Sequence, residues 1–173
     1  AVGFGLNSTL PSHARLSAGG AGTVVTTAAD GTATFIDLRL YELGSGFSFE
    51  ASSEGLGTAQ TSATFRVSIG PAALLRFSQL PSDNNAKDVY FARQPAVEVV
   101  DLGGNRVNRT LHVITLALVD PADRLRGPKV RWTQRGVASF ERLRIRLPGY
   151  DKRIIATSPG LQPATTPFFG VIP

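Results

Sequence analysis

The chain has 173 residues, of which 42% are hydrophobic and 18% charged, so it can bury a core and is not expected to be disordered. It contains no cysteine, which excludes a disulfide framework, a thiolate nucleophile and a thiol-ligated metal site. No apolar run approaches the roughly 20 residues that cross a bilayer, so no direct membrane insertion is expected. The first residues lack the basic region of a secretory signal, so export would require that a signal has been removed or that the chain is an excerpt.

The sequence repeats itself at a domain-sized spacing. The stretch GTATFIDLRL at residues 31–40 matches GVASFERLRI at residues 136–145, an offset of 105 residues. Residues 50–67 match residues 155–171 at the same offset, which becomes 104 near the end. A repeat of this length is a domain rather than a solenoid unit.

We therefore predict two domains, at residues 1–70 and 71–173. They join near Ile69-Gly70-Pro71, where glycine and proline interrupt a strand pattern. A linker this short should couple neighbouring domains stiffly.

Apolar residues in the second domain recur with the period of strands, and no segment carries a helical stripe. Between Arg142 and Leu147, for example, arginines alternate with leucine and isoleucine, which gives one solvent-exposed and one buried face. Short strands with frequent turn signals predict an all-β fold of tandem immunoglobulin-like antiparallel β-sandwiches. The strands expected in this domain lie at residues 73–77, 96–101, 112–119, 129–133, 137–140, 143–146, 153–157 and 168–172.

The segment QPAVEVVDLGGNRV, residues 94–107, predicts a strand that runs into a tight corner. Its alternating valines face one way and Glu98 the other, so we expect a half-buried strand. Asp101 can turn its carboxylate back onto loop amides, and Gly103, Gly104 and Asn105 tolerate positive φ. A metal site centred on Asp101 is the alternative interpretation.

Four motifs, PAVEVVDLGGNRV, HVITLAL, GVASFERLRI and IIATSPGLQPATTPFFGV, resemble the bacterial Ig-like repeats of invasin and intimin type. The likeness covers nearly all of residues 71–173 and the later strands of residues 1–70. The resemblance implies a stacked extracellular rod without catalytic residues, so no catalytic role is carried over to any residue.

The first domain departs from that pattern. Val2, Phe4 and Leu6 predict the strand equivalent to residues 113–118, and the two strands that precede it in the pattern are missing. A sandwich without them would expose a wide apolar face and an unpaired edge. We favour an excerpt of a longer tandem array over donation of the strands by a neighbouring subunit through β-augmentation.

Residues with the chemistry for catalysis or metal binding are few. His13 and His112 lack a partner motif, so we expect solvent-facing or core-edge roles for them. Asp120 and Asp123 lie in a proline-containing turn without the acidic run of a calcium loop. The glycine-rich residues 17–22 lack the Lys-Ser/Thr of a phosphate loop. We therefore predict no enzymatic activity, no metal and no cofactor.

Asn7 and Asn108 each open an Asn-x-Ser/Thr sequon, one in each domain, and both are expected in loops. They are candidate glycosylation sites if the host is eukaryotic. The Ser/Thr/Pro-rich residues 158–167 can also take O-linked sugars.

The two domains carry opposite net charge. Residues 1–70 hold three arginines against five acidic residues, and residues 71–173 hold 15 basic residues against eight acidic ones, so their net charges are −2 and +7. A basic face attracts polyanions such as acidic glycans, or it contacts a neighbouring domain of opposite sign, which we favour. Nucleic acid is not expected, because aromatic residues do not interleave with the basic ones. The candidate contact residues are Arg124, Arg126, Arg131, Arg135, Arg142 and Arg144.

These features predict a structural or adhesive repeat segment of a long extracellular or cell-surface protein. It would act as a stiff spacer whose partners are neighbouring repeats and other copies in a filament or coat. The sequons and the cysteine-free composition fit an algal surface glycoprotein, such as a mastigoneme or flagellar-coat component, with a bacterial adhesin as the alternative. Two other functions stay open: an acidic-glycan-binding module that uses the basic face of residues 71–173, and an accessory domain of a larger enzyme.

Overall fold

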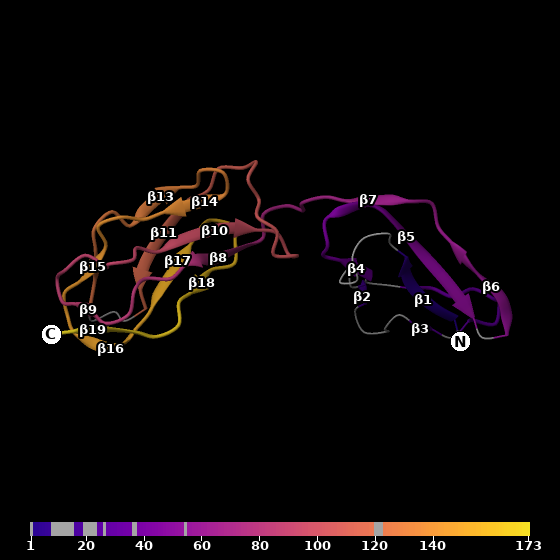
Figure 1. The fold of residues 1–173 in the computed structure, drawn as a ribbon, viewed down its shortest axis with the longest axis horizontal. Coiled ribbons are helices and arrows are strands. Elements are labelled where there is room, and N and C mark those ends of the chain that lie inside the picture. The colour runs from indigo at the N-terminus through magenta and orange to yellow at the C-terminus, as the bar shows by residue number, and fades with distance from the viewer. Residues whose placement is uncertain are drawn as a thin grey trace. The chain divides into compact units, whose positions relative to one another are not determined.

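In a computed structural model the chain is built from β-strands (Figure 1). The structure describes residues 2–7, 16–18, 24–25, 27–35, 38–53, 55–119 and 123–173. Within these ranges there is no helix, and hence none that is long and apolar enough to span a membrane. All strand pairs but one short parallel pair are antiparallel. The prediction of an all-β fold of antiparallel β-sandwiches is confirmed.

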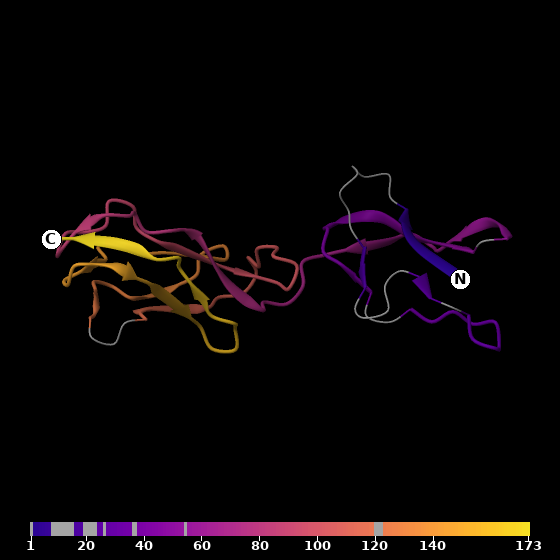
Figure 2. The same ribbon diagram turned by 90° about the horizontal axis from the view of Figure 1, so that it is seen from below.

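The chain divides into two compact units, Ala1–Ile69 and Gly70–Pro173, here called unit 1 and unit 2. Unit 2 contains two principal sheets, with the strand orders β14-β10-β8 and β13-β11-β17-β18. Two smaller sheets, β12-β15 and β16-β19-β9, complete it (Figures 1 and 2).

The strands of the first principal sheet are β8 (Leu74–Gln79), β10 (Ala96–Val100) and β14 (Val137–Ser139). Those of the second are β11 (Val113–Leu118), β13 (Val130–Trp132), β17 (Ile154–Thr157) and β18 (Ala164–Thr165). The smaller sheets contain β9 (Asn85–Ala86), β12 (Leu125–Arg126), β15 (Arg144–Ile145), β16 (Gly149–Lys152) and β19 (Phe169–Ile172).

Each of the eight strands expected in unit 2 has a counterpart in the structure. The strands that sequence reading missed are β9, β12, β16 and β18, which have two to four residues each. Alternation over so few positions cannot be distinguished from a loop, so only their pairing partners define them as strands.

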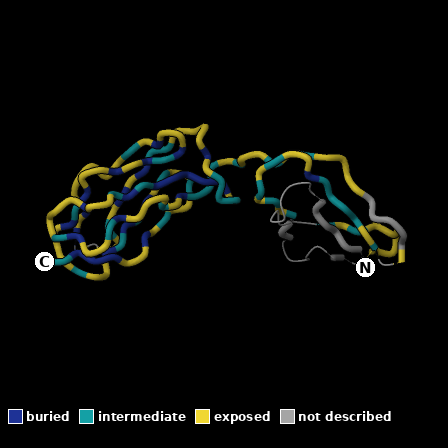
Figure 3. Tube along the Cα trace, in the orientation of Figure 1, coloured by how far each residue is buried: buried dark blue, intermediate teal, exposed yellow. Residues whose placement is uncertain are grey.

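The apolar faces of the two principal sheets meet in one core. Val97 and Val99 of β10 are fully buried, and they share a hydrophobic cluster with Ile114 and Leu116 of β11. Burying one side chain of this kind contributes about 1.5–3 kcal/mol to folding. The apolar face of each strand, set by the alternation in sequence, therefore turns toward the core. Figure 3 shows buried segments throughout unit 2.

Unit 1 repeats the strand order of one principal sheet of unit 2. Its order β3-β1-β5-β6 corresponds to β13-β11-β17-β18. β7 pairs with the first half of β5 as β19 pairs with β16, and β2 pairs with β4 as β12 pairs with β15. The sequence repeat is therefore also a repeat of strand topology. The strands of unit 1 are β1 (Val2–Asn7), β2 (Leu16–Ala18), β3 (Val24–Val25), β4 (Leu38–Leu40), β5 (Gly44–Ser53), β6 (Leu56–Thr61) and β7 (Phe65–Val67).

One matched stretch adopts different structures in the two units. Residues 137–139 form β14, which pairs with β10, whereas residues 31–35 form no strand. The part of unit 1 that the structure describes has no counterpart of β10 for them to pair with. A strand needs partners for its backbone N–H and C=O groups, so the available partner decides the outcome here.

The described side chains of unit 1 bury little apolar surface. Among residues 27–35, 38–53, 55 and 61–69, Phe47 is the only buried one. Its ring centroid lies 6.0 Å from that of Phe65, which lies 4.7 Å from that of Phe49. These rings form the one aromatic cluster that is described among the side chains of unit 1.

Unit 2 should fold alone and unit 1 should not. Expressed separately, residues 70–173 are expected to be monomeric and to unfold in one cooperative urea transition, because their core is covered on both sides. Residues 1–69 are expected to aggregate or stay unfolded. Far-UV circular dichroism and light scattering measure both outcomes; a monomeric fragment 1–69 with a cooperative transition would contradict the prediction.

Candidate functional site

The carboxylate of Asp101 closes the corner that follows β10. Its Oδ1 accepts hydrogen bonds from the backbone N–H groups of Gly103 and Asn105, each at 2.9 Å. Its Oδ2 accepts one from the N–H of Gly70 at 2.9 Å, and the side-chain amide of Asn105 donates to both oxygens at 3.2 Å. The predicted turn of the carboxylate onto loop amides is confirmed. Of the three residues expected to tolerate positive φ, only Gly104 uses it, at 79°.

The hydrogen bonds of Asp101 identify it as a structural acceptor. Burial alone would raise the pKa of Asp101, but the hydrogen bonds from Gly70, Asn105 and Gly103 outweigh burial and hold its pKa below the ordinary value. No group of three or more His, Cys, Asp or Glu residues in the described ranges could hold a metal ion. The geometry therefore supports the corner and offers nothing toward the metal alternative.

Glu98 is buried, so the expectation of a half-buried strand is wrong. Its exposed fraction is 4%. Arg76 Nε donates to its Oε1 at 2.8 Å, and Arg106 Nε donates to its Oε2 at 2.7 Å. Burial alone would raise the pKa of Glu98, but the hydrogen bonds and charges of Arg106 and Arg76 outweigh burial and hold its pKa below the ordinary value. The strand is buried on both faces because two arginine side chains cover the face that carries this carboxylate.

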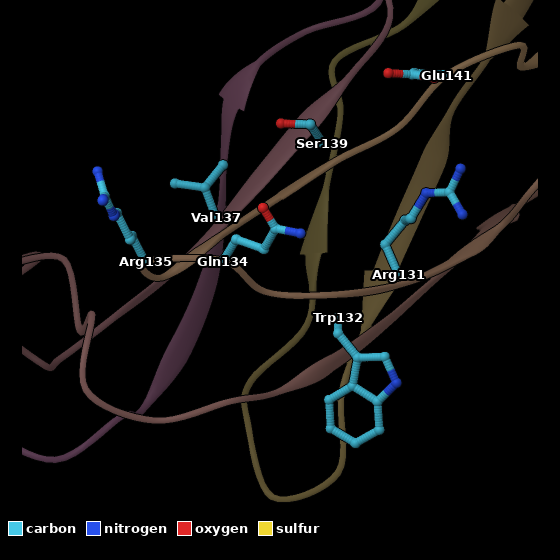
Figure 4. Close-up of a pocket in the computed structure, with 7 residues that line it drawn as sticks. All are labelled: Arg131, Trp132, Gln134, Arg135, Val137, Ser139 and Glu141. Atoms are coloured by element: carbon cyan, nitrogen blue, oxygen red, sulfur yellow. The ribbon is translucent and has the colours of Figure 1, made fainter.

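An open groove of about 610 Å³ lies where β13 and β14 meet (Figure 4). Each of these strands is at the edge of its own principal sheet, so the groove runs along one side of the sandwich. The lining side chains come from β13, from the turn that joins the two strands, and from β14 and the residues just after it. They are Arg131, Trp132, Gln134, Arg135, Val137, Ser139 and Glu141.

The turn between β13 and β14 is a tight two-residue hairpin. Gln134 and Val137 exchange two backbone hydrogen bonds, of 2.7 and 3.0 Å. Arg135 and Gly136 between them both have positive φ, 50° and 81°, which is the geometry of a type I′ turn. A Cβ at Gly136 would lie 2.4 Å from the carbonyl oxygen of Val107, so this position requires glycine.

Three polar residues of the groove, Arg131, Gln134 and Arg135, lie in β13 and in the turn that follows it. Figure 4 shows the amide of Gln134 between the guanidinium groups of Arg131 and Arg135. No ion pair within the described ranges involves either arginine or Glu141. The indole of Trp132, 63% exposed, points away from Arg131, because successive side chains of a strand alternate.

The other candidate arginines have different surroundings. Arg124 and Arg126 line a second groove, of about 360 Å³, together with Arg146. Arg144 lies 3.1 Å from Asp88 as an ion pair without hydrogen-bond geometry, and its guanidinium lies 5.2 Å from the ring centroid of Tyr90. Arg142 is exposed, with a φ of 54°. The six arginines thus divide among separate environments, which sequence alone could not resolve.

Sequence reading also missed a buried ion pair. Lys152 Nζ lies 3.3 Å from Asp123 Oδ2, and both side chains are buried. The sequence predicts Asp123 only as part of a turn, and Asp120 lies outside the described residues. The partner of Asp123 comes from β16, distant in the chain, so no local pattern signals the pair.

The histidine and sequon predictions are only partly covered by the described residues. His112 is half-buried, with its Nε2 2.9 Å from the hydroxyl of Thr110, and His13 lies outside the described ranges. Asn108 is exposed and outside any strand. Asn7 is the last residue of β1, where it pairs with Ser48, so the expectation that it lies in a loop is wrong; nothing is described of its side chain. Glycosylation at either asparagine stays a prediction.

Comparison with known proteins gives little beyond the fold. No protein-family model matches the sequence, and no curated protein matches it. A crystal structure of a glycosyl hydrolase family 2 member from Bacteroides cellulosilyticus is similar over 79% of this chain, with 20% identity and a TM-score of 0.47. A family 2 member from Bacteroides cellulosilyticus DSM 14838 is similar over 77%, with 17% identity and a TM-score of 0.45. The matches cover 18% and 20% of those chains, so this chain spans about a fifth of their length. Likeness this low carries no conclusion about activity.

Replacing Asp101 should destabilise unit 2. D101A removes the acceptor for three backbone N–H groups, so the free energy of unfolding of unit 2, measured in residues 1–173, should fall by about 2–4 kcal/mol. Urea denaturation measures the loss. The control D151A alters an exposed aspartate and should change stability by less than about 0.5 kcal/mol. Equal effects of the two substitutions would contradict the role of the corner.

Acid should destabilise unit 2 through Asp101 and Glu98. Both have a pKa below the ordinary value, so the unfolded state binds their protons more tightly than the folded state. Their contribution is complete above the unfolded pKa values of about 4 and is lost as pH falls through the folded ones. We expect Tm to fall steeply below about pH 4, and E98Q to make that slope shallower. A wild-type Tm that stays constant to about pH 2.5 would contradict this.

Proposed function

We propose that the chain is a non-catalytic structural segment of a longer polypeptide, in which β-sandwich units set the spacing between other parts. The observation that carries this proposal is the bond from Gly70 to Asp101. Gly70 begins unit 2, directly after the last residue of unit 1. The carboxylate that closes the corner therefore also holds the entry point of the chain, as a spacer requires.

The buried charged groups of unit 2 support a structural role. Glu98 is bonded to two arginines, Asp101 to loop amides, and Asp123 is paired with Lys152. A perturbed pKa often indicates an active site, but the carboxylates of Glu98 and Asp101, whose pKa is lowered, are both engaged by structural partners. Such groups specify one packing of the strands and are not free to take up or release a substrate proton.

Unit 1 supports membership in a larger assembly. Its described strands correspond to one principal sheet of unit 2, and Phe47 is its single buried residue within the ranges where exposure is described. A second layer would cover the sheet that β1 and β5 form. We propose that further strands supply this layer, either from the same polypeptide or from a neighbouring subunit.

Two settings suit a segment of this kind. The sequence resemblance favours a tandem array in an extracellular rod, filament or coat, with mastigoneme-like and adhesin-like proteins as examples. The same units would serve as an accessory segment of a larger enzyme. Flanking sequence distinguishes the two, since further repeats support the array and a catalytic domain supports the accessory segment.

Hydrogen exchange at Gly70 tests the spacer proposal in residues 1–173. Because its N–H is held by Asp101, the Gly70 amide should exchange at least about tenfold more slowly than an open amide. D101A should abolish that protection, whereas D151A should leave it unchanged. Free exchange of Gly70 in the unsubstituted chain would mean a loose linker and would overturn the proposal.

A further inference from the structure

We infer that the groove between β13 and β14 binds a saccharide that carries a carboxylate, such as a uronic-acid oligosaccharide. This site goes beyond the structural role proposed above and does not depend on it. Of the six arginines that the sequence offers as contacts for acidic glycans, only Arg131 and Arg135 belong to this site. The site also includes the neutral side chains of Gln134 and Ser139, which the sequence did not indicate.

The groove is held in shape by bonds to the interior. Thr133, fully buried beneath it, accepts a hydrogen bond from the His112 N–H at 3.0 Å and donates its own N–H to the His112 carbonyl at 2.9 Å. The carbonyl of Gly136 accepts a hydrogen bond from the Val99 N–H at 2.9 Å. β13 and the hairpin turn are thereby fastened to the two principal sheets. A ligand can bind such a groove without ordering it first.

Two guanidinium groups supply the attraction for a carboxylate. Arg131 and Arg135 lie on either side of the groove's central amide (Figure 4), and no described residue forms an ion pair with them. A guanidinium presents its N–H groups as a fork that matches a carboxylate, and charge-assisted bonds of this kind are stronger than neutral ones.

The other polar groups select a ligand that also carries hydroxyls. Gln134 offers an amide, Ser139 a hydroxyl and Glu141 a carboxylate. An ionised carboxylate accepts hydrogen bonds only, so Glu141 can accept from sugar hydroxyls, and it repels any anionic group placed beside it, a carboxylate as well as a phosphate or sulfate. Nucleic acid and heavily sulfated chains have fewer free hydroxyls for Glu141 to bind, so the combination fits a saccharide that carries both carboxylates and hydroxyls. The indole of Trp132 points elsewhere and is not needed for the first contact.

The second groove provides a matched comparison. Arg124, Arg126 and Arg146 line it with Leu147 and Asp123, whose carboxylate is paired with Lys152. It therefore has positive charge without the amide and free carboxylate that would recognise hydroxyls. Removing two arginines there changes the net charge as much as removing two from the first groove.

Titration of residues 1–173 with tetragalacturonate tests the inference, by calorimetry at low ionic strength, where screening is weak. The double substitution R131Q/R135Q should weaken binding at least about tenfold, because two charge-assisted contacts are lost. R124Q/R126Q should weaken it less than about threefold, since only the long-range field changes. The substitution S139A, at an exposed position, should weaken binding without risk to the fold.

Three results would overturn the inference. Equal losses in the two double variants would show that net charge alone attracts the ligand. Equal binding of the methyl-esterified tetragalacturonide would show that the carboxylate is not recognised. Tighter binding of single-stranded oligonucleotide than of tetragalacturonate would assign the groove to nucleic acid. Thermal melting of each variant confirms that it is folded before its affinity is compared.

Discussion

Much of unit 2 depends on the hydrogen bonds that the carboxylate of Asp101 accepts. It ends β10, binds the amides of the corner, and holds the N–H of Gly70 at the start of the unit. Because the corner reverses the chain, Arg106 returns to pair with Val100 and bonds Glu98. A single acceptor thus links the entry of the chain, the central strand and the residues that cover it.

The corner after β10 also positions the residues of the surface groove. After the corner, Val107 donates its N–H to the Val99 carbonyl at 2.9 Å, and its own carbonyl lies against Gly136. The close approach excludes a side chain at Gly136, so the hairpin turn must pass directly over this backbone. The groove residues are therefore positioned by a corner that contributes no side chain to the groove.

Buried charge in unit 2 is compatible with stability only because each charge has a partner. Leaving a buried carboxylate alone costs several kcal/mol, and replacing an intact pair by apolar groups is often neutral. Glu98 with its arginines and Asp123 with Lys152 therefore contribute more to a unique arrangement of strands than to net stability. This agrees with a segment whose function is to keep a defined shape.

The sequence by itself determined the all-β class, the longer strands, the repeat and the corner at Asp101. Each of these arises from local chemistry: alternation of period two, glycine at the turns, and a carboxylate within reach of amides a few residues away. Only the tertiary structure decided that Glu98 is buried, that Asp123 pairs with Lys152, and that four of the six candidate arginines line two separate grooves. It also decided that residues 31–35 form no strand although their counterpart does. For Arg76 with Glu98, for Lys152 with Asp123 and for residues 31–35, the deciding partner lies far away in the chain or is missing from the described residues, so no local pattern encodes it.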